Sequence, residues 1–222
     1  MKGCLSDFLN MKGNTSAMQI LHIDATQALG KTKISFDGAD TLSLSSHKIY
    51  GLNGSGLLIK RKGLAIEPLI HGGNSTTIYR SGTPTFALDA STECALRLAD
   101  EYFDSRIEIV RKHNDYLREK LSAYKKVRFN SPENAVPHIL NISVNGVKAK
   151  DFQAALDKYG VCVSVKSACS VEGTPSRSVF AVSRDRKNAL SSWRISLSHL
   201  TSKIELDEFL NIFDDCYREL TK

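Results

Sequence analysis

A lysine preceded by two serines and a histidine is the first segment that could do chemistry. In Ser45-Ser-His-Lys48 the lysine follows an apolar stretch and precedes a glycine-rich turn. A lysine at the end of a strand can be partly shielded from water, and its amine is then a nucleophile toward a carbonyl. The Ser45 hydroxyl and the His47 ring could bind a phosphate beside it. Taken alone, the tetrapeptide is more typical of an exposed lysine at a turn.

Asp24 and Gln27 add a second feature earlier in the chain. Asp24 ends an apolar stretch, where an aspartate commonly caps the following turn. A buried carboxylate at this place could instead pair with the protonated pyridine nitrogen of pyridoxal phosphate and strengthen its electron sink. Gln27, one turn later, could donate a hydrogen bond to the ring oxygen. The order Asp, Gln and then Ser-x-His-Lys is much more specific than any one part.

Cys169 and Arg194 are the candidate reactive residues in the second half of the chain. Cys169 lies in a polar loop close to Lys166, and a nearby cation favours the thiolate. A lone cysteine is more often buried and inert, a role that suits Cys162 between two valines. Arg194, in a strand with apolar neighbours, needs an anion, and its planar fork suits a substrate carboxylate. A structural salt bridge is the alternative for Arg194.

The long loop from His71 to Pro84 carries a weaker signal. Its segment Arg80-Ser-Gly-Thr83 offers a cation, two hydroxyls and a flexible turn. Loops of this length in a compact domain are usually functional or mobile. The segment could contact a phosphate or a carboxylate.

Regular elements must position these residues, and their pattern indicates an α/β protein of two domains. Strands separated by loops in the first part are typical of an α/β layer, and the apolar stripe that follows predicts one long helix or two. The first domain covers residues 1–104 and the second, a small α+β domain, covers 105–222. The predicted strands are 18–23, 41–45, 56–60, 138–144, 161–165 and 192–197, and the predicted helices are 86–124, 148–159 and 203–220.

Composition excludes several classes of protein. The chain has 222 residues, of which 41% are hydrophobic and 24% charged, which is not the composition of a disordered, collagen-like or coiled-coil protein. No apolar run approaches the roughly 20 residues of a membrane span, and the first residues lack the pattern of a secretory signal. The net charge of +6 is spread along the chain, so we expect neither a nucleic-acid nor a membrane partner. Five cysteines without a CxxC pair predict no metal site, no disulfide framework and a cytoplasmic location.

Together these segments resemble the cysteine desulfurases, which are pyridoxal-phosphate enzymes of the class-V aminotransferase group. The resemblance implies an aspartate-aminotransferase-like fold, PLP fold type I, with a mixed, mostly parallel sheet in the large domain. Family members are longer, and the part without a counterpart here is the N-terminal portion of that domain. The match runs from about residue 20 to the C-terminus, and the segments that carry it are His22–Gly30, Ser45–Gly51, His71–Gly73, Arg80–Thr83, Val136–Ser143, Ser167–Cys169 and Ser192–Leu197.

The resemblance also implies a role for each candidate residue in the large domain. Lys48 would bind the cofactor covalently and later move protons. Asp24 would pair with the pyridine nitrogen and Gln27 with the ring hydroxyl oxygen. Ser45 and His47 would bind the cofactor phosphate.

The remaining roles concern the substrate and the partners. Arg194 would bind the carboxylate of L-cysteine, and Cys169 would attack the substrate sulfur to give L-alanine and a persulfide on Cys169. Thr83 would reach the cofactor phosphate of the second subunit in a homodimer. The Ser-Ala-Cys context resembles the branch that delivers sulfur to iron–sulfur scaffolds or to sulfur carriers for tRNA and cofactor thiolation.

Two other functions remain open on the sequence. One is a different class-V pyridoxal-phosphate aminotransferase or lyase, which would not need Cys169. The other is a non-catalytic module that dimerises or binds a sulfur-acceptor protein through the small domain.

Overall fold

The computed structural model describes residues 20–73, 77–165 and 174–222. The chain divides into two compact units, Met1–Phe103 and Asp104–Lys222.

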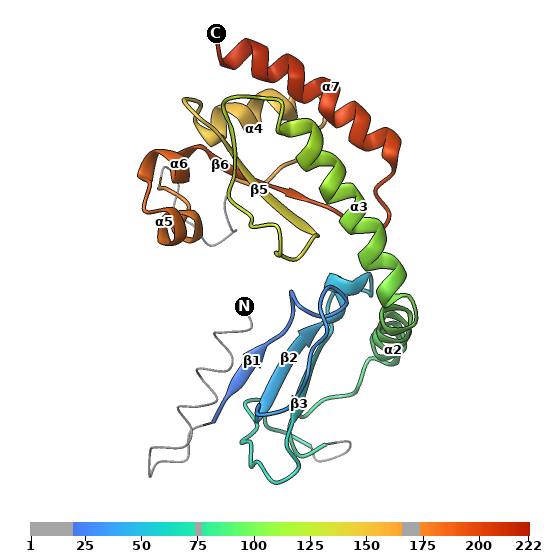
Figure 1. Cartoon of the computed structure of the whole chain (residues 1–222). Helices are drawn as coiled ribbons and strands as arrows, with labels where there is room; N and C mark the ends of the chain where they lie inside the picture. The colour runs from blue at the N-terminus through green and yellow to red at the C-terminus, as the bar shows by residue number, and fades with distance from the viewer. Residues whose placement is uncertain (1–19, 74–76, 166–173) are drawn as a thin grey trace. The chain divides into compact units, whose positions relative to one another are not determined.

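The N-terminal unit is built on a mixed sheet, as the sequence predicts. Its strands are β1 (His22–Asp24), β2 (Thr41–Ser45) and β3 (Gly56–Lys60), in the order β1-β2-β3. β1 is parallel to β2, and β2 is antiparallel to β3. Figure 1 shows the three strands side by side. The 3-10 helix η1 (Ser46–Ile49) follows β2 directly, and the helix α2 (Phe86–Glu101) packs against it.

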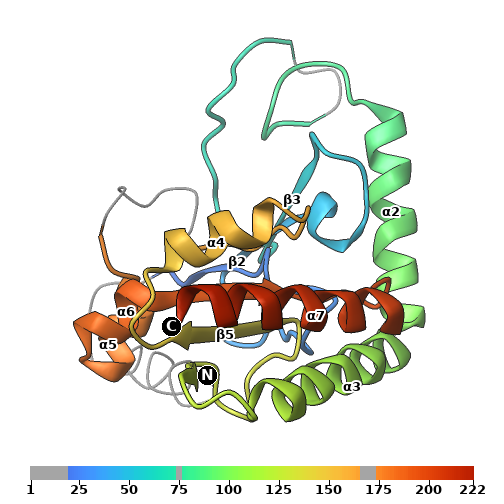
Figure 2. The ribbon, with the colours of Figure 1, turned by 90° about the horizontal axis from the view of Figure 1, so that it is seen from above.

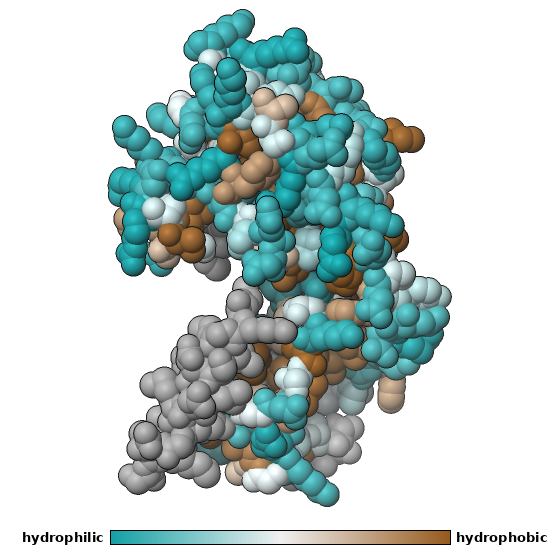
Figure 3. Space-filling model, viewed as in Figure 1, coloured by the Kyte–Doolittle hydropathy of each residue, from teal (hydrophilic) through white to brown (hydrophobic). Residues whose placement is uncertain are grey.

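This unit has little hydrophobic core among its described residues. One cluster is centred on Leu42 and Leu44 in β2, and another joins Ile49 of η1 to two alanines of α2. Large apolar side chains stay outside, and Leu69 is 96% and Phe86 80% exposed. On the face drawn in Figure 3, brown hydrophobic surface is correspondingly visible on this unit. Since burial of apolar area is the main stabilising term, we expect this unit to be the less stable one.

The C-terminal unit is an α+β structure with a much larger core. Its sheet has the order β4-β5-β6, and both pairs are antiparallel. In Figures 1 and 2 the helices α3, α4 and α7 lie together on one side of this sheet, and their apolar residues share one core with it. The elements are α3 (Phe103–Leu121), β4 (Val127–Phe129), β5 (Ile139–Val144), α4 (Ala149–Asp157), α5 (Arg177–Ser183), α6 (Arg186–Ser191), β6 (Ser192–Ser196) and α7 (Lys203–Leu220).

Alternation along β5 and β6 divides their sheet into an apolar and a polar face. Successive side chains of a strand point to opposite faces. Leu140 and Ile142 of β5 lie opposite Ile195 and Trp193 of β6, and all four are buried in the core. The residues between them include Asn141, which lies opposite Arg194. Arg194 is therefore on the polar face of the sheet.

Most predicted elements are confirmed, one is shifted and one is wrong. The predicted strand 18–23 overlaps β1 only at His22 and Ile23, and its residues 18 and 19 lie outside the described residues. The strands 41–45 and 56–60 and the helix 203–220 have the predicted bounds, and the stretch 86–124 forms two helices that meet at Tyr102. The predicted strand 161–165 is wrong, because only Ser164 pairs with the sheet, through an isolated bridge to Arg194. The alternating apolar residues of this segment pack on the core without forming a ladder. No helix in the described ranges is long and apolar enough to cross a membrane.

Candidate active site

The ends of two parallel strands bring the first candidate residues to the same edge of the sheet. Asp24 is the last residue of β1 and lies opposite Ser43 in β2. Ser45 is the last residue of β2. Because β1 and β2 run parallel, both strands end at one edge, the place where open α/β sheets bind ligands.

The Ser45, His47 and Lys48 side chains are held on the turn that follows β2. The Ser45 hydroxyl and the His47 Nδ1 are hydrogen-bonded at 2.7 Å. His47 and Lys48 are exposed on η1, whereas Ile49 of the same helix is buried. The geometry brings a hydroxyl, an imidazole and a primary amine together at the end of one strand.

Ser46 fixes the conformation of this turn, a role that was not predicted for it from the sequence. Its side chain is buried, and its hydroxyl donates a hydrogen bond to the Leu52 carbonyl at 2.9 Å and is 2.7 Å from the Ser55 hydroxyl. The chain returns closely enough that a Cβ on Gly51 would lie 2.9 Å from the Ser46 Cβ. The signal for this role was the pair of small residues, Ser46 and Gly51, on either side of the lysine.

Asp24 places a carboxylate at the end of β1. Its Oδ1 accepts a hydrogen bond from the Thr26 backbone N–H at 3.0 Å. Hydrogen bonds from the hydroxyl and the backbone N–H of Thr26 hold the pKa of the Asp24 carboxyl below its usual value. Gln27 is exposed, and its Oε1 accepts a hydrogen bond from the Lys31 ammonium at 2.9 Å.

Asp24 and Lys48 are both exposed. The burial that could have accompanied a cofactor site is therefore not found at these two residues, and the two side chains match the alternatives of a turn cap for Asp24 and an exposed lysine at a turn. Leu44 and Ile49, which lie near them in the sequence, are buried in the two small hydrophobic clusters of this unit. The charged side chains of Asp24 and Lys48 face outward instead.

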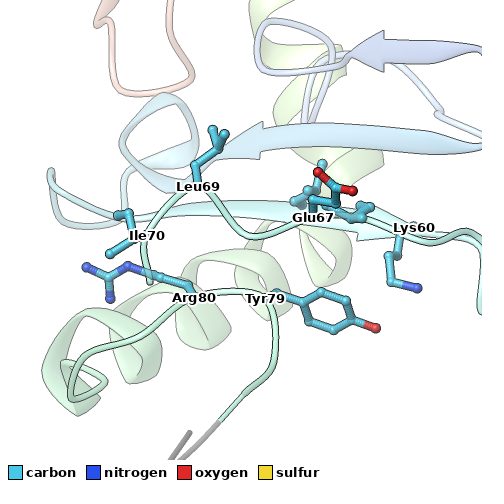
Figure 4. A pocket seen from close by; sticks show the side chains of 8 residues that line it. Lys60, Glu67, Leu69, Ile70, Tyr79 and Arg80 are labelled. Atoms are coloured by element: carbon cyan, nitrogen blue, oxygen red, sulfur yellow. The ribbon is translucent and has the colours of Figure 1, made fainter. Parts of the chain in front are cut away.

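The loop that carries Thr83 borders a hollow of about 300 Å³ on the N-terminal unit. Figure 4 shows Lys60 and Tyr79 at one end of this hollow and Ile70 and Arg80 at the other. The Lys60 ammonium lies over the Tyr79 ring, 5.1 Å from its centroid. Thr83 itself is exposed and does not line the hollow.

Arg194 is the candidate residue described in the C-terminal unit. It is half-buried, and its Nη2 donates a hydrogen bond to the Ser164 hydroxyl at 3.1 Å. Its Nε is buried and has no hydrogen-bond partner among the described residues. Cys169 and Lys166 lie outside the described residues. Cys162 was expected to be buried but is exposed, because the alternating valines of its segment, Val161 and Val163, pack on the core and the cysteine between them faces outward.

Each unit therefore presents its own set of polar groups among its described residues. The N-terminal unit presents an anion, an amine and a hydroxyl–imidazole pair, and the C-terminal unit presents a guanidinium. In the described part of the chain no three histidine, cysteine or acidic side chains are grouped as metal ligands would be.

The chain belongs to the aminotransferase class-V family, whose family model matches residues 7–209. It is similar to a protein named cysteine desulfurase IscS from Dictyoglomus turgidum, with 35% identity over 204 residues, which are 90% of this chain and 52% of that protein. The chain thus spans about half the length of the curated relatives it matches. The predicted resemblance to cysteine desulfurases is confirmed.

Solved structures give the same result for the fold. A structure named NifS-like protein has a TM-score of 0.86 and 27% identity, with 97% of this chain and 57% of that chain covered. A NifS-like protein from Rickettsia africae has a TM-score of 0.83 and 26% identity, with 96% and 57% covered. The predicted aspartate-aminotransferase-like fold, present here in part, is confirmed.

Proposed function

We propose that the chain is a cysteine desulfurase or the C-terminal part of one. It would take sulfur from L-cysteine, release L-alanine and leave a persulfide on Cys169. The sulfur atom passes from the substrate to the Cys169 thiol, so L-cysteine and one thiol give L-alanine and one persulfide, with no outside oxidant. The observation that carries the proposal is the common sheet edge of Asp24 and the Ser45–Lys48 turn, in a chain whose curated relatives are named cysteine desulfurases.

Members of this family use pyridoxal phosphate, and the residues at the sheet edge fit that cofactor. When bound, the cofactor supplies an electron sink for breaking bonds at the substrate. The Asp24 carboxylate, whose pKa the hydrogen bonds from Thr26 lower, suits a protonated pyridine nitrogen. The Ser45 hydroxyl and the His47 ring suit a phosphate, because the hydrogen bond between them still leaves the pair an O–H or N–H donor for an anion.

The other residues of the chain would complete the site. The Lys48 amine would bind the cofactor and then accept and return protons. Gln27 would donate its amide to the ring oxygen once its Oε1 is satisfied by Lys31. Arg194 would hold the carboxylate of the substrate, and Thr83 would reach the cofactor phosphate of a second copy in a homodimer.

The partners follow from the product. A persulfide on Cys169 is useful only to a protein that accepts sulfur, so we infer an iron–sulfur scaffold or a sulfur carrier as the next partner. We also place the protein in the cytoplasm. Cys94, Cys162 and Cys216 are free thiols, as is usual in a reducing compartment.

A second function is favoured by the exposed apolar surface of the N-terminal unit. Side chains such as Leu69 and Phe86 suit contact with another polypeptide. A non-catalytic module that dimerises could use this surface, and one that binds a sulfur acceptor would do so through the small domain. Neither would need Lys48 or Cys169.

The proposed function is tested by L-alanine formation. The full chain is incubated with pyridoxal phosphate and L-cysteine, and alanine and protein persulfide are measured together. We expect both products from the wild-type chain, neither from Lys48→Ala, and no persulfide from Cys169→Ser. Exposed Lys33 provides the matched control Lys33→Ala, which should keep the activity.

Each alternative function has its own outcome in this experiment. A reaction of L-cysteine that survives Cys169→Ser would indicate another class-V lyase or aminotransferase. No alanine from the wild-type chain, with dimer formation retained, would indicate the non-catalytic module.

A further inference from the structure

Arg194 carries a positive charge that the described part of the chain does not neutralise. No aspartate or glutamate among the described residues lies within ion-pair distance of its guanidinium, and its buried Nε has no partner. A buried donor that is left unpaired loses its hydrogen bonds to water without replacement. Such a donor calls for an explanation, and a bound anion would supply one.

The side chain opposite Arg194 offers it no acceptor. Asn141 faces Arg194 across the β5–β6 pair. The Asn141 Oδ1 accepts a hydrogen bond from the Asn130 Nδ2 at 2.9 Å, and Asn130 in turn accepts one from Asn188. The Asn141 Oδ1 is thus bonded to Asn130 and not to Arg194, and within the described ranges the Ser164 hydroxyl is the one acceptor of the Arg194 side chain.

Ser164 is fixed relative to Arg194 by its backbone as well. The Ser164 N–H donates to the Arg194 carbonyl at 3.2 Å, and the Arg194 N–H donates to the Ser164 carbonyl at 2.7 Å. The two residues form an isolated bridge at the edge of the sheet. The two backbone hydrogen bonds fix Ser164 beside β6, so its hydroxyl is held in place to accept the hydrogen bond from the Arg194 Nη2.

We propose that Ser164 is a positioning residue that orients the Arg194 guanidinium to receive a substrate carboxylate. With Nη2 anchored, the planar fork keeps one orientation, and its remaining N–H groups face a ligand without first losing rotational freedom. Ser164 precedes Cys169 by five residues in the sequence. The same residue thus joins the carboxylate-binding strand to the segment that carries the proposed nucleophile. This inference rests on the proposed function for the identity of the ligand.

The test uses side-chain NMR of the full chain and needs no cofactor. The Arg194 Nε–Hε signal and the rotation of its terminal amino groups are measured, and L-alanine is then added as the carboxylate probe. In Ser164→Ala we expect clearly faster rotation and about fivefold weaker binding of L-alanine, the usual effect of losing one hydrogen bond. Ser164→Thr keeps a hydroxyl and should restore both. The exposed Ser196, on the same strand, provides the control Ser196→Ala, which should change neither.

The outcomes separate this inference from the proposed function. Unchanged rotation and affinity in Ser164→Ala would overturn the inference. So would a wild-type Arg194 that binds no L-alanine, because the anchor would then be structural only. If L-alanine binds in a Ser164-dependent way but L-cysteine gives no Cys169 persulfide, the inference holds and the desulfurase function fails.

Discussion

Replacing Phe213 by alanine should destabilise the C-terminal unit selectively. Phe213 is fully buried on α7, with the rings of Tyr124 and Phe152 at 5.1 Å and 5.2 Å from its own. Removing a buried phenylalanine costs about 3–5 kcal/mol, because apolar contacts are lost and a cavity remains. We therefore expect the free energy of unfolding of this unit to fall by about 4 kcal/mol.

Urea denaturation followed by tryptophan fluorescence measures this effect directly. The chain has one tryptophan, and Trp193 lies buried in the same core, so its fluorescence reports the C-terminal unit alone. With a slope of about 2 kcal/mol per M urea, a loss of about 4 kcal/mol lowers the midpoint by about 2 M. Phe213→Leu keeps much of the volume and should cost less than about 1.5 kcal/mol.

The matched control lies on the same helix. Ile204 is 79% exposed on α7, so Ile204→Ala should change the free energy of unfolding by less than about 0.5 kcal/mol. A midpoint for Phe213→Ala within about 0.5 M of this control would refute the assignment of α7 to the core.

Three further predictions concern pH, ligand affinity and local stability. The Ser202 backbone N–H and hydroxyl lower the pKa of Glu205 below its usual 4.5, so the stabilisation of α7 by Glu205 is present above about pH 4.5 and is lost as the pH falls below it. Glu205→Gln should therefore make the urea midpoint less dependent on pH in that range. An unchanged pH dependence in Glu205→Gln would assign the effect to other groups. Arg194→Lys keeps the charge but loses the planar fork, so calorimetry should show about tenfold weaker binding of L-alanine; equal affinity would argue against a two-point contact. The N-terminal unit has the smaller hydrophobic core, so it should unfold locally at a lower free-energy cost, and amide hydrogen exchange should be faster at Leu42 in β2 than at Ile142 in β5. Faster exchange at Ile142 would contradict this comparison of the two cores.

Elements with a strong local pattern could be predicted from the sequence. The alternation of Thr41–Ser45 marks a half-buried strand, and the helix Lys203–Leu220 combines one apolar stripe with a capping box between Ser202 and Glu205. β4 was missed because three residues are too few to show a period. The segment 161–165 alternates like a strand but has a single bridge to the sheet, since tertiary packing decides which apolar segments pair.

The candidate site was predictable in its residue types but not in its surroundings. Lys48, Asp24 and Arg194 were found because their chemistry is unusual at the ends and in the middle of strands. Their burial depends on residues far away in the sequence, and no local pattern encodes it. Ser164 was missed for the same reason, because its contact with Arg194 spans 30 residues.

The central claim, that Lys48 and its neighbours bind pyridoxal phosphate, is tested most directly by cofactor retention. The full chain is equilibrated with pyridoxal phosphate, dialysed, and its visible absorbance is compared with that of Lys48→Ala and the control Lys33→Ala. The account predicts that the wild-type chain and Lys33→Ala keep the absorbance band of a lysine-bound cofactor and that Lys48→Ala loses it. A band that is absent from the wild-type chain, or equal in all three proteins, would contradict the account.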